Sequence, residues 1–275
     1  MMSDGDLKLS RFPAREMTKA IHRTVLRPIS TESSMFGDDI GQNSLTLKRE
    51  YEGFLQDLQA ALGKRLLDVA CGAGGPALFS ARKTGCSVVG IDINADGIAT
   101  AKTRARELGL ADRAIFQVTD VGTKLPFENE AFDAIICVDA VIHFSNRQEL
   151  FREWRRVLRE QGRVLFTDPV VITGLVTDEE LATRSSIAKF VFSPPGEDER
   201  LLKEAKLKPL RIENSTSAMG QVARDWRASR ARHEDELVKL EGPERFQGLQ
   251  KFFDCVNRLA EEKRMSRFTI LAERG

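Results

Sequence analysis

Two acidic residues flank a glycine-rich turn in the first third of this 275-residue chain. Asp68 comes just before the turn, Gly72 and Gly74 lie within it, and Asp92 follows twenty residues after Gly72. Glycine has no Cβ, so the backbone can turn sharply there and come close to a ligand. A carboxylate at the distance of Asp92 can accept hydrogen bonds from both hydroxyls of a ribose. The spacing therefore predicts a pocket for an adenosine-type ligand.

The residues around the turn also indicate which nucleotide fits. A dinucleotide places its pyrophosphate on a helix N-terminus, where Pro76 removes one donor N–H and Ala77 replaces the last glycine of the usual pattern. Asp68 would repel a pyrophosphate, whereas it would attract an ammonium or a sulfonium group. S-adenosylmethionine has no phosphate and carries both of these cations. The alternative is a nicotinamide dinucleotide, which would make the chain an NAD(P)-dependent oxidoreductase.

Strands and helices must alternate around this turn to position it. Apolar runs predict strands at 65–69, 87–92, 114–118, 133–138 and 163–167. Helices are expected at 50–62, from Pro76, from Asn94, and from Ser145 or Asn146 to Gly162. This alternation predicts an α/β fold with a doubly wound, mostly parallel sheet. Ligands of such sheets bind beyond the carboxyl ends of the strands.

The chain is expected to have three parts. Residues 1–60 have the pattern of N-terminal helices and loops, residues 61–170 that of a nucleotide-binding core, and residues 171–275 that of helices plus the final strands of the same sheet. Helices are expected at 177–190 and 197–205, then a long helical region between strand runs at 210–213 and 267–272. We expect this helical insertion to cap the pocket; the alternative is an ordinary outer layer of helices.

Composition excludes several classes of function. Lys and Arg number 42 against 41 Asp and Glu, so no broad basic field is expected for nucleic acid, and the basic stretch 8–27 is interpreted as a solvated helix face. No apolar run reaches the roughly 20 residues of a membrane span, and no signal peptide is seen, which predicts a cytoplasmic protein. The four cysteines lack zinc-type spacing, so no metal site is expected.

Five motifs together carry a family resemblance. Leu66–Gly75 reads Leu-Leu-Asp-Val-Ala-Cys-Gly-Ala-Gly-Gly, and Gly90-Ile-Asp-Ile, Thr119-Asp-Val, Phe132-Asp133 and Trp154-Arg-Arg-Val-Leu follow. The set resembles class I S-adenosylmethionine-dependent methyltransferases, especially small-molecule enzymes of the ubiquinone/menaquinone, tocopherol and sarcosine–dimethylglycine type. The resemblance covers roughly residues 50–170. It implies a Rossmann-like seven-stranded sheet, S-adenosylmethionine as cofactor and S-adenosylhomocysteine as product.

The resemblance also implies roles for individual residues. Asp68 and the backbone from Ala70 to Gly74 would hold the methionine portion, while Asp92 would bind the ribose. Asp120 would accept a hydrogen bond from the adenine amino group; the alternative is a turn cap. The implied cofactor-binding residues are Asp68, Ala70, Cys71, Gly72, Gly74, Asp92, Ile93, Asp120, Val121, Val138 and His143. Ala70 departs from the glycine of many members, and Gln42 and Tyr51 lie where related enzymes close an N-terminal segment.

Methyl transfer from a sulfonium needs alignment and, for a hydroxyl or ammonium acceptor, a base. His143 follows the fourth strand and is the candidate base, although it could instead pack or bond the cofactor. Asp168 could orient an acceptor or cap the next turn, and Asp139 is interpreted as stabilising its loop. With 16 Phe, one Tyr and two Trp, the expected acceptor is a small hydrophobic metabolite methylated on oxygen, nitrogen or carbon, as in secondary metabolism. A non-catalytic S-adenosylmethionine-binding protein and a homodimer are also considered.

Overall fold

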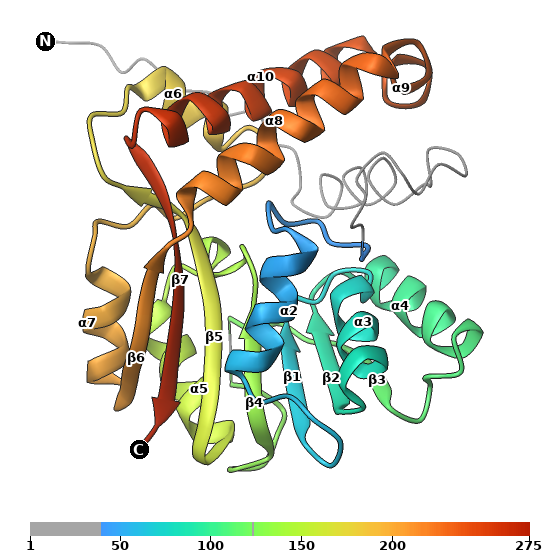
Figure 1. Cartoon of the computed structure of the whole chain (residues 1–275), viewed down its shortest axis with the longest axis vertical. Coiled ribbons are helices and arrows are strands. Elements are labelled where there is room, and N and C mark those ends of the chain that lie inside the picture. Colours follow the sequence, from blue (N-terminus) through green and yellow to red (C-terminus); the bar gives the residue numbers. More distant parts are fainter. Residues whose placement is uncertain (1–39, 123) are drawn as a thin grey trace, which may run out of the picture.

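The computed structural model describes residues 40–122 and 124–275. The basic stretch 8–27 and most of the predicted N-terminal helices lie outside these residues. The described elements are α2 (Lys48–Asp57), β1 (Arg65–Val69), α3 (Gly75–Thr84), β2 (Ser87–Asp92), α4 (Ala95–Glu107), β3 (Ala114–Val118), β4 (Phe132–Cys137), the 3-10 helix η1 (Val141–His143), α5 (Arg147–Val157), β5 (Leu158–Ile172), α6 (Asp178–Arg184), α7 (Glu197–Glu204), β6 (Leu207–Asn214), α8 (Thr216–Arg232), α9 (Glu234–Glu241), α10 (Pro243–Glu261) and β7 (Met265–Arg274) (Figure 1).

The strands form one seven-stranded sheet in the order β3-β2-β1-β4-β5-β7-β6. The first five strands of this order pair in parallel, whereas β7 is antiparallel to both β5 and β6. The reversal has a simple cause: β6 ends at the carboxyl edge of the sheet, α8–α10 stay at that edge, and the next strand must run back. The predicted mostly parallel α/β sheet is therefore confirmed.

Side chains that alternate along β1 serve two separate cores, one on each face of the sheet. Leu66 packs in the core formed with α2, α3 and α4. Leu67 and Val69 point to the opposite face and pack in the core formed with α5 and α7, which includes the fully buried Trp154. Helices on both faces leave only the strand ends free to meet a ligand.

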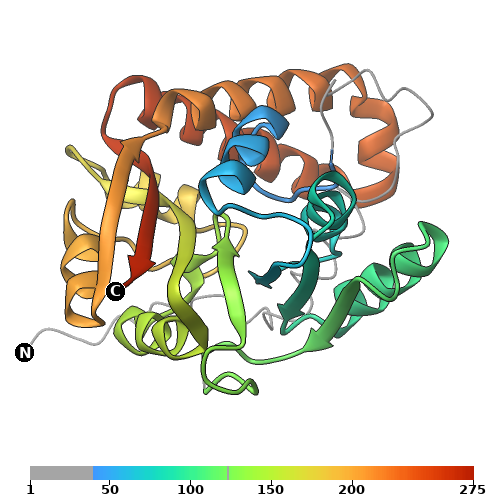
Figure 2. The ribbon, with the colours of Figure 1, turned by 60° about the horizontal axis from the view of Figure 1, so that its bottom comes forward.

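Helices α8 and α10 pack against each other and lie above the carboxyl ends of the parallel strands in both views (Figures 1 and 2). Their shared core includes Met219, Phe252 and Val256, and Leu45 from the segment before α2 joins it. In the described residues, no helix is long and apolar enough to span a membrane.

Several boundaries differ from those predicted. The fifth helix ends at Val157, and β5 runs from Leu158 to Ile172, so Gly162 lies inside a strand instead of ending a helix. A Cβ on Gly162 would come within 2.8 Å of the Arg159 carbonyl oxygen, which explains the glycine. The helix predicted at 50–62 ends at Asp57. The helix predicted at 177–190 ends at Arg184, after which the backbone N–H of Val191 donates to the Ile142 carbonyl at 2.7 Å.

Candidate functional site

The glycine turn follows β1 and requires left-handed backbone at three positions. Ala70, Gly72 and Gly74 have φ angles of 60°, 55° and 75°. A Cβ on Gly74 would lie 2.6 Å from the Cβ of Ala101 and 2.9 Å from the Phe116 ring, so only glycine fits there. Ala70 takes a conformation in which glycine is unstrained, which accounts for the glycine of many related sequences at this position.

Asp92 ties this turn to the end of β2. Its Oδ2 accepts a hydrogen bond from the Gly72 backbone N–H at 2.8 Å, and its Oδ1 accepts one from the Asn94 N–H at 2.8 Å. Each carboxylate oxygen keeps a second lone pair, so both can still accept from ligand hydroxyls. The adjacent Ile93 is 65% exposed, which places a large apolar side chain at the rim where the prediction puts an adenine ring.

Asp68 is buried beneath the turn and lacks the partners that buried carboxylates usually have. Its Oδ2 has no hydrogen-bond partner in the described part of the chain. Desolvation, and then the negative charge of Asp92, raise the pKa of Asp68 to about 8. A buried acid without a donor is costly in isolation, so this position suits an incoming cation.

Asp120 and Val121 follow β3 at the same edge. Asp120 is exposed, and its Oδ1 accepts a hydrogen bond from the Gly122 N–H at 2.9 Å, which is a turn-capping contact. Val121 is buried in the core on one face of the sheet. Val138 is half-buried just after β4 and packs against the opposite core. These positions leave the adenine-binding role of Asp120 a prediction.

His143 ends the 3-10 helix η1 beyond β4, and its side chain is exposed. Its Nδ1 lies 3.2 Å from the carbonyl oxygen of Lys189, and its ring centroid lies 5.4 Å from that of Phe190. Desolvation lowers the pKa of His143, against smaller opposing effects of the Lys189 carbonyl and the Asp92 charge. A carbonyl partner requires Nδ1 to carry the proton, so Nε2 is left as the basic nitrogen.

Asp168 is not exposed at the carboxyl edge of the sheet, contrary to the prediction that it orients an acceptor there. It is fully buried, and its Oδ2 accepts from Arg147 Nη1 and Ser193 Oγ, each at 2.6 Å. Its Oδ1 accepts from the Val170 N–H at 3.0 Å, as in the turn-capping alternative. Arg147 also donates to Asp198 Oδ1 at 2.8 Å. All of these partners lie within the chain, so Asp168 belongs to a buried ion-pair network.

The segment before α2 lies against the same edge of the sheet. Asp139 Oδ2 accepts from the Leu45 N–H at 2.8 Å, and Asp139 Oδ1 accepts from Thr167 Oγ1 at 2.6 Å, in keeping with a loop-stabilising role. The fully buried Arg267 donates to the Leu45 carbonyl and pairs with Glu50. Sequence reasoning missed Arg267, because an arginine within an apolar strand run is the only signal that the sequence offers.

Gln42 and Tyr51 make contacts within the protein instead of facing an open surface. Gln42 bonds within its own loop, accepting from the Ile40 N–H at 2.9 Å and donating to the Thr46 carbonyl at 3.2 Å. Tyr51 is buried, and its hydroxyl oxygen accepts from Ser80 Oγ at 3.3 Å. Closure over a ligand therefore stays a prediction for these two residues.

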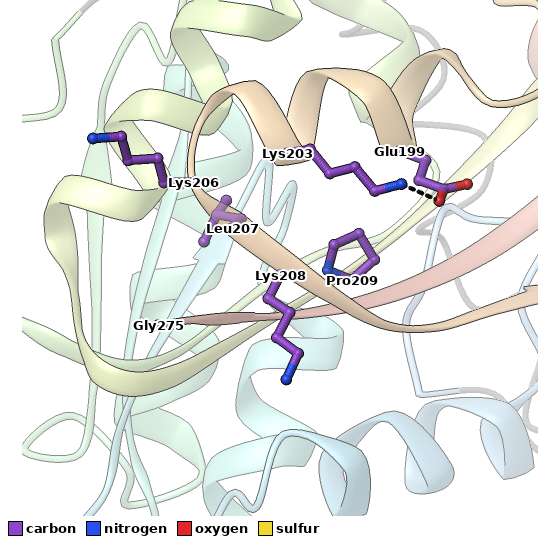
Figure 3. Close-up of a pocket in the computed structure, with 7 residues that line it drawn as sticks. All are labelled: Glu199, Lys203, Lys206, Leu207, Lys208, Pro209 and Gly275. Atoms are coloured by element: carbon purple, nitrogen blue, oxygen red, sulfur yellow. Dashed lines mark hydrogen bonds and ion pairs between the residues drawn. The ribbon is translucent and has the colours of Figure 1, made fainter.

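A surface hollow of about 550 Å³ lies away from these residues (Figure 3). It is lined by Glu199, Lys203, Lys206, Leu207, Lys208, Pro209 and Gly275. Leu207 begins β6, and β6 runs parallel to β5, so the hollow lies at the amino edge of the sheet. Lys203 pairs with Glu199 at 2.8 Å, and none of the predicted site residues lines the hollow.

Residues 66–162 match the methyltransferase domain family. This segment holds β1 through the first part of β5, and with them the glycine turn, Asp92 and His143. The seven-stranded order with an antiparallel β7 extends the same architecture beyond the matched segment. Residues 66–162 of the chain therefore form a methyltransferase domain.

Curated relatives that match part of the chain include two methyltransferases. The chain is 37% identical to the methyltransferase GfsG of Streptomyces halstedii over 131 residues, which are 48% of this chain and 46% of the relative. It is 31% identical to the 27-O-demethylrifamycin SV methyltransferase of Amycolatopsis mediterranei over 150 residues, or 54% and 55% of the two chains. The matches thus span about half the length of these curated relatives.

A solved structure resembles the chain over nearly its whole length. The geranyl diphosphate C-methyltransferase of Streptomyces coelicolor, solved with Mg²⁺, geranyl diphosphate and S-adenosyl-L-homocysteine, superposes with a TM-score of 0.71. The superposition covers 97% of this chain and 100% of that one, at 17% sequence identity. At this identity the likeness shows the shared fold.

Proposed function

We propose that the chain binds S-adenosylmethionine at the glycine turn and transfers its methyl group to a small-molecule acceptor. The observation that carries this proposal is the pairing of two carboxylates at one turn. Asp68 is a buried acid that finds no donor among residues 40–122 and 124–275, and Asp92 is an acid whose oxygens can still accept hydrogen bonds. A ligand with an ammonium group at one end and a ribose at the other satisfies both, whereas a pyrophosphate would be repelled by Asp68.

The residues present fit this cofactor. When bound, S-adenosylmethionine supplies an activated methyl group on a sulfonium. Asp68 would attract the ammonium group, the backbone from Ala70 to Gly74 would hold the methionine portion, and Asp92 would accept from the ribose. The exposed Ile93 would cover the adenine and exclude water from it. In this reaction the protein mainly aligns the two partners and keeps water away.

Replacing Asp92 with alanine tests the cofactor site. The variant loses the ribose acceptor and the clamp on Gly72, so the affinity for S-adenosylhomocysteine should fall at least about tenfold, the equivalent of one charge-assisted hydrogen bond. Isothermal titration calorimetry measures this directly, with circular dichroism to check folding. Asp112→Ala is the control, because Asp112 is an exposed acid in the turn before β3, at the opposite edge of the sheet. Unchanged affinity in Asp92→Ala would rule out the site.

We further propose that Nε2 of His143 takes the proton from an acceptor hydroxyl or ammonium. The Lys189 carbonyl favours the tautomer that leaves Nε2 unprotonated, and the lowered pKa keeps the ring neutral below its ordinary titration range. The rate should therefore decline only when the pH falls below about 6.5, the ordinary pKa of histidine.

His143→Gln tests the base. Glutamine keeps polarity and cannot take a proton, so turnover should fall about a hundredfold or more while affinity for S-adenosylhomocysteine stays within about twofold. Transfer of labelled methyl from S-adenosylmethionine to a panel of aromatic and polyketide-type hydroxyl compounds supplies the measurement. His233→Gln is the control, because that histidine caps α8 beyond the site. Full turnover in His143→Gln would show that His143 is not the base.

The acceptor that we propose is a mainly apolar metabolite. Phe190 contacts His143, and the buried Val141 and Ile142 precede His143 in the same 3-10 helix, so the surroundings of the proposed base are largely hydrocarbon. A relative that acts on 27-O-demethylrifamycin SV supports a polyketide-like acceptor. A homodimer, a cytoplasmic location and the lack of nucleic-acid partners stay predictions.

A further inference from the structure

Among the buried arginines that the structure describes, one differs from the others because it forms no ion pair there. The described residues include four buried arginines: Arg147, Arg184, Arg230 and Arg267. Three of them form ion pairs with carboxylates, namely Asp168 and Asp198, Glu241, and Glu50. Arg184 is only 2% exposed, yet in the described part of the chain no carboxylate lies within ion-pair distance of it.

The surroundings of Arg184 satisfy little of its hydrogen-bonding capacity. Its Nη2 donates to the Pro169 carbonyl at 3.2 Å, whereas its Nε is buried without a partner. The guanidinium carbon lies 5.3 Å from the centre of the Phe190 ring and 5.1 Å from that of Phe252. Burial lowers the pKa of Arg184 to about 10, so the group still carries its charge at neutral pH. A guanidinium has five N–H donors; in the described residues one of them donates to the Pro169 carbonyl, and the Nε donor has no acceptor.

Arg184 also lies next to the proposed transfer site. It ends α6, and its carbonyl partner Pro169 follows Asp168 on β5, near the carboxyl edge of the sheet. The Phe190 ring lies close to both Arg184 and His143. Phe252 belongs to α10, the helix above this edge. The guanidinium of Arg184 therefore lies near the carboxyl edge of the sheet, helix α10 and the candidate base His143.

We propose that Arg184 binds an anionic oxygen group of the methyl acceptor, a carboxylate or a phosphate, once the Phe190 ring moves aside. The acceptor would then combine an apolar body beside His143 with an acid at the guanidinium. A planar guanidinium matches such groups with two parallel hydrogen bonds, and a buried position strengthens them. This inference rests on the proposed methyl transfer and specifies its substrate class.

A purely structural role would be better filled by an apolar side chain. Burying a cation without an ion-pair partner destabilises the fold, and two aromatic rings offset only part of that cost. Arg184→Met preserves the length and apolar stem of the side chain while it removes the charge. In the described residues no carboxylate pairs directly with Arg184, and the charges of Asp139 and Asp168 act on it only from a greater distance. The variant should therefore melt at the same temperature as the wild type or higher.

Three matched probes test the proposal by calorimetry on the protein saturated with S-adenosylhomocysteine. They are 4-hydroxybenzoate, 4-hydroxyphenyl phosphate and the uncharged methyl 4-hydroxybenzoate. At least one acid should bind about tenfold tighter than the ester, consistent with one charge-assisted contact, and whichever acid does so identifies the group. Arg184→Met should lose this preference, and Arg184→Lys should retain part of it. Arg152→Met, which removes an exposed arginine of α5, should leave the preference unchanged.

The outcomes separate this inference from the function on which it rests. If wild-type protein fails to bind S-adenosylhomocysteine, the proposed function is wrong, and the proposed role of Arg184 is wrong with it. If it binds S-adenosylhomocysteine but neither acid, or binds acid and ester equally, only the role of Arg184 is overturned. An acid preference that survives in Arg184→Met also overturns it. Should that variant fail to fold, a preference in Arg184→Lys as strong as the wild type's would count against the role, because lysine lacks the guanidinium fork.

Discussion

Asparagine in place of Asp68 is expected to stabilise the cofactor-free protein and to weaken cofactor binding at least about a hundredfold. Both effects have one cause, which is a buried carboxylate to which no group in the described part of the chain donates a hydrogen bond. The amide has nearly the same shape and is cheaper to bury, so the fold gains stability. The same amide cannot pair with the ammonium group and sulfonium of S-adenosylmethionine, so the ligand loses its main electrostatic contact.

The pH dependence of this effect follows from the direction of the pKa shift. The pKa of Asp68 is raised to about 8, first by desolvation and second by the charge of Asp92, from an ordinary value of 3.8. The folded state therefore holds this proton more tightly than the unfolded state does. Protonation of Asp68 therefore stabilises the folded state. This contribution is complete below about pH 4 and is lost as the pH rises towards about 8. At pH 7 the loss amounts to at most about 4 kcal/mol.

Urea unfolding at pH 5 and pH 8 measures the gain in stability, and calorimetry with S-adenosylhomocysteine measures the loss of affinity. The gain from Asp68→Asn should be larger at pH 8. Asp133→Asn is a control for which the change in stability should have the opposite sign. Burial raises the pKa of Asp133, but hydrogen bonds from Arg65, Arg159 and Lys64 outweigh it and lower the pKa. That variant should lose stability at neutral pH. An Asp68→Asn protein that is less stable at pH 8, or that binds normally, would contradict the assignment.

Arg147→Met is expected to destabilise the protein by about 3–5 kcal/mol, the usual cost of breaking a buried ion pair by removing one partner. Arg147 bonds Asp168, Asp198 and the Val191 carbonyl at 2.6, 2.8 and 2.9 Å. Without the guanidinium, two buried carboxylates face each other with no cation between them. The affected segment, from Val191 to Asp198, follows the residues that contact His143.

Chemical denaturation at pH 7 measures this loss. Arg152→Met provides the control, because Arg152 lies on the same helix with half of its side chain exposed and should change stability by less than about 0.5 kcal/mol. Adding Asp198→Asn to Arg147→Met should restore part of the lost stability, since burial raises the pKa of Asp198 and the amide removes its charge. A single variant within about 1 kcal/mol of the wild type would show that the network is not a major source of stability.

Local features of the site could be predicted because each depends on neighbours in the chain. The strands 65–69, 87–92 and 114–118 have the predicted bounds. Asn94 and Asn146 cap their helices by accepting from the backbone N–H groups of Asp96 and Glu149. A short apolar run between turn residues forms a buried strand in most contexts, and an asparagine before a helix caps it through contacts two or three residues away.

The roles of the buried charges could not be predicted in this way. Asp168 follows an apolar strand run, as a site residue would, but its environment is made by Arg147 from another helix and Ser193 from a distant loop. The length of β5 depends likewise on pairing with β4 and β7, which carries it past Gly162. Contacts between residues far apart in sequence leave no local pattern.

By itself the sequence determined the α/β order of elements, the glycine turn and the acids that accompany it, because strand period, glycine spacing and capping residues act over a few positions. Only the tertiary structure decided which acids are free to meet a ligand. Within the described residues, Asp68 has no hydrogen-bond donor, Asp168 forms an ion pair with Arg147, and Arg184 is buried without an ion-pair partner. The physical reason is that the chemistry of a charged side chain depends on its desolvation and on the partners that folding brings to it.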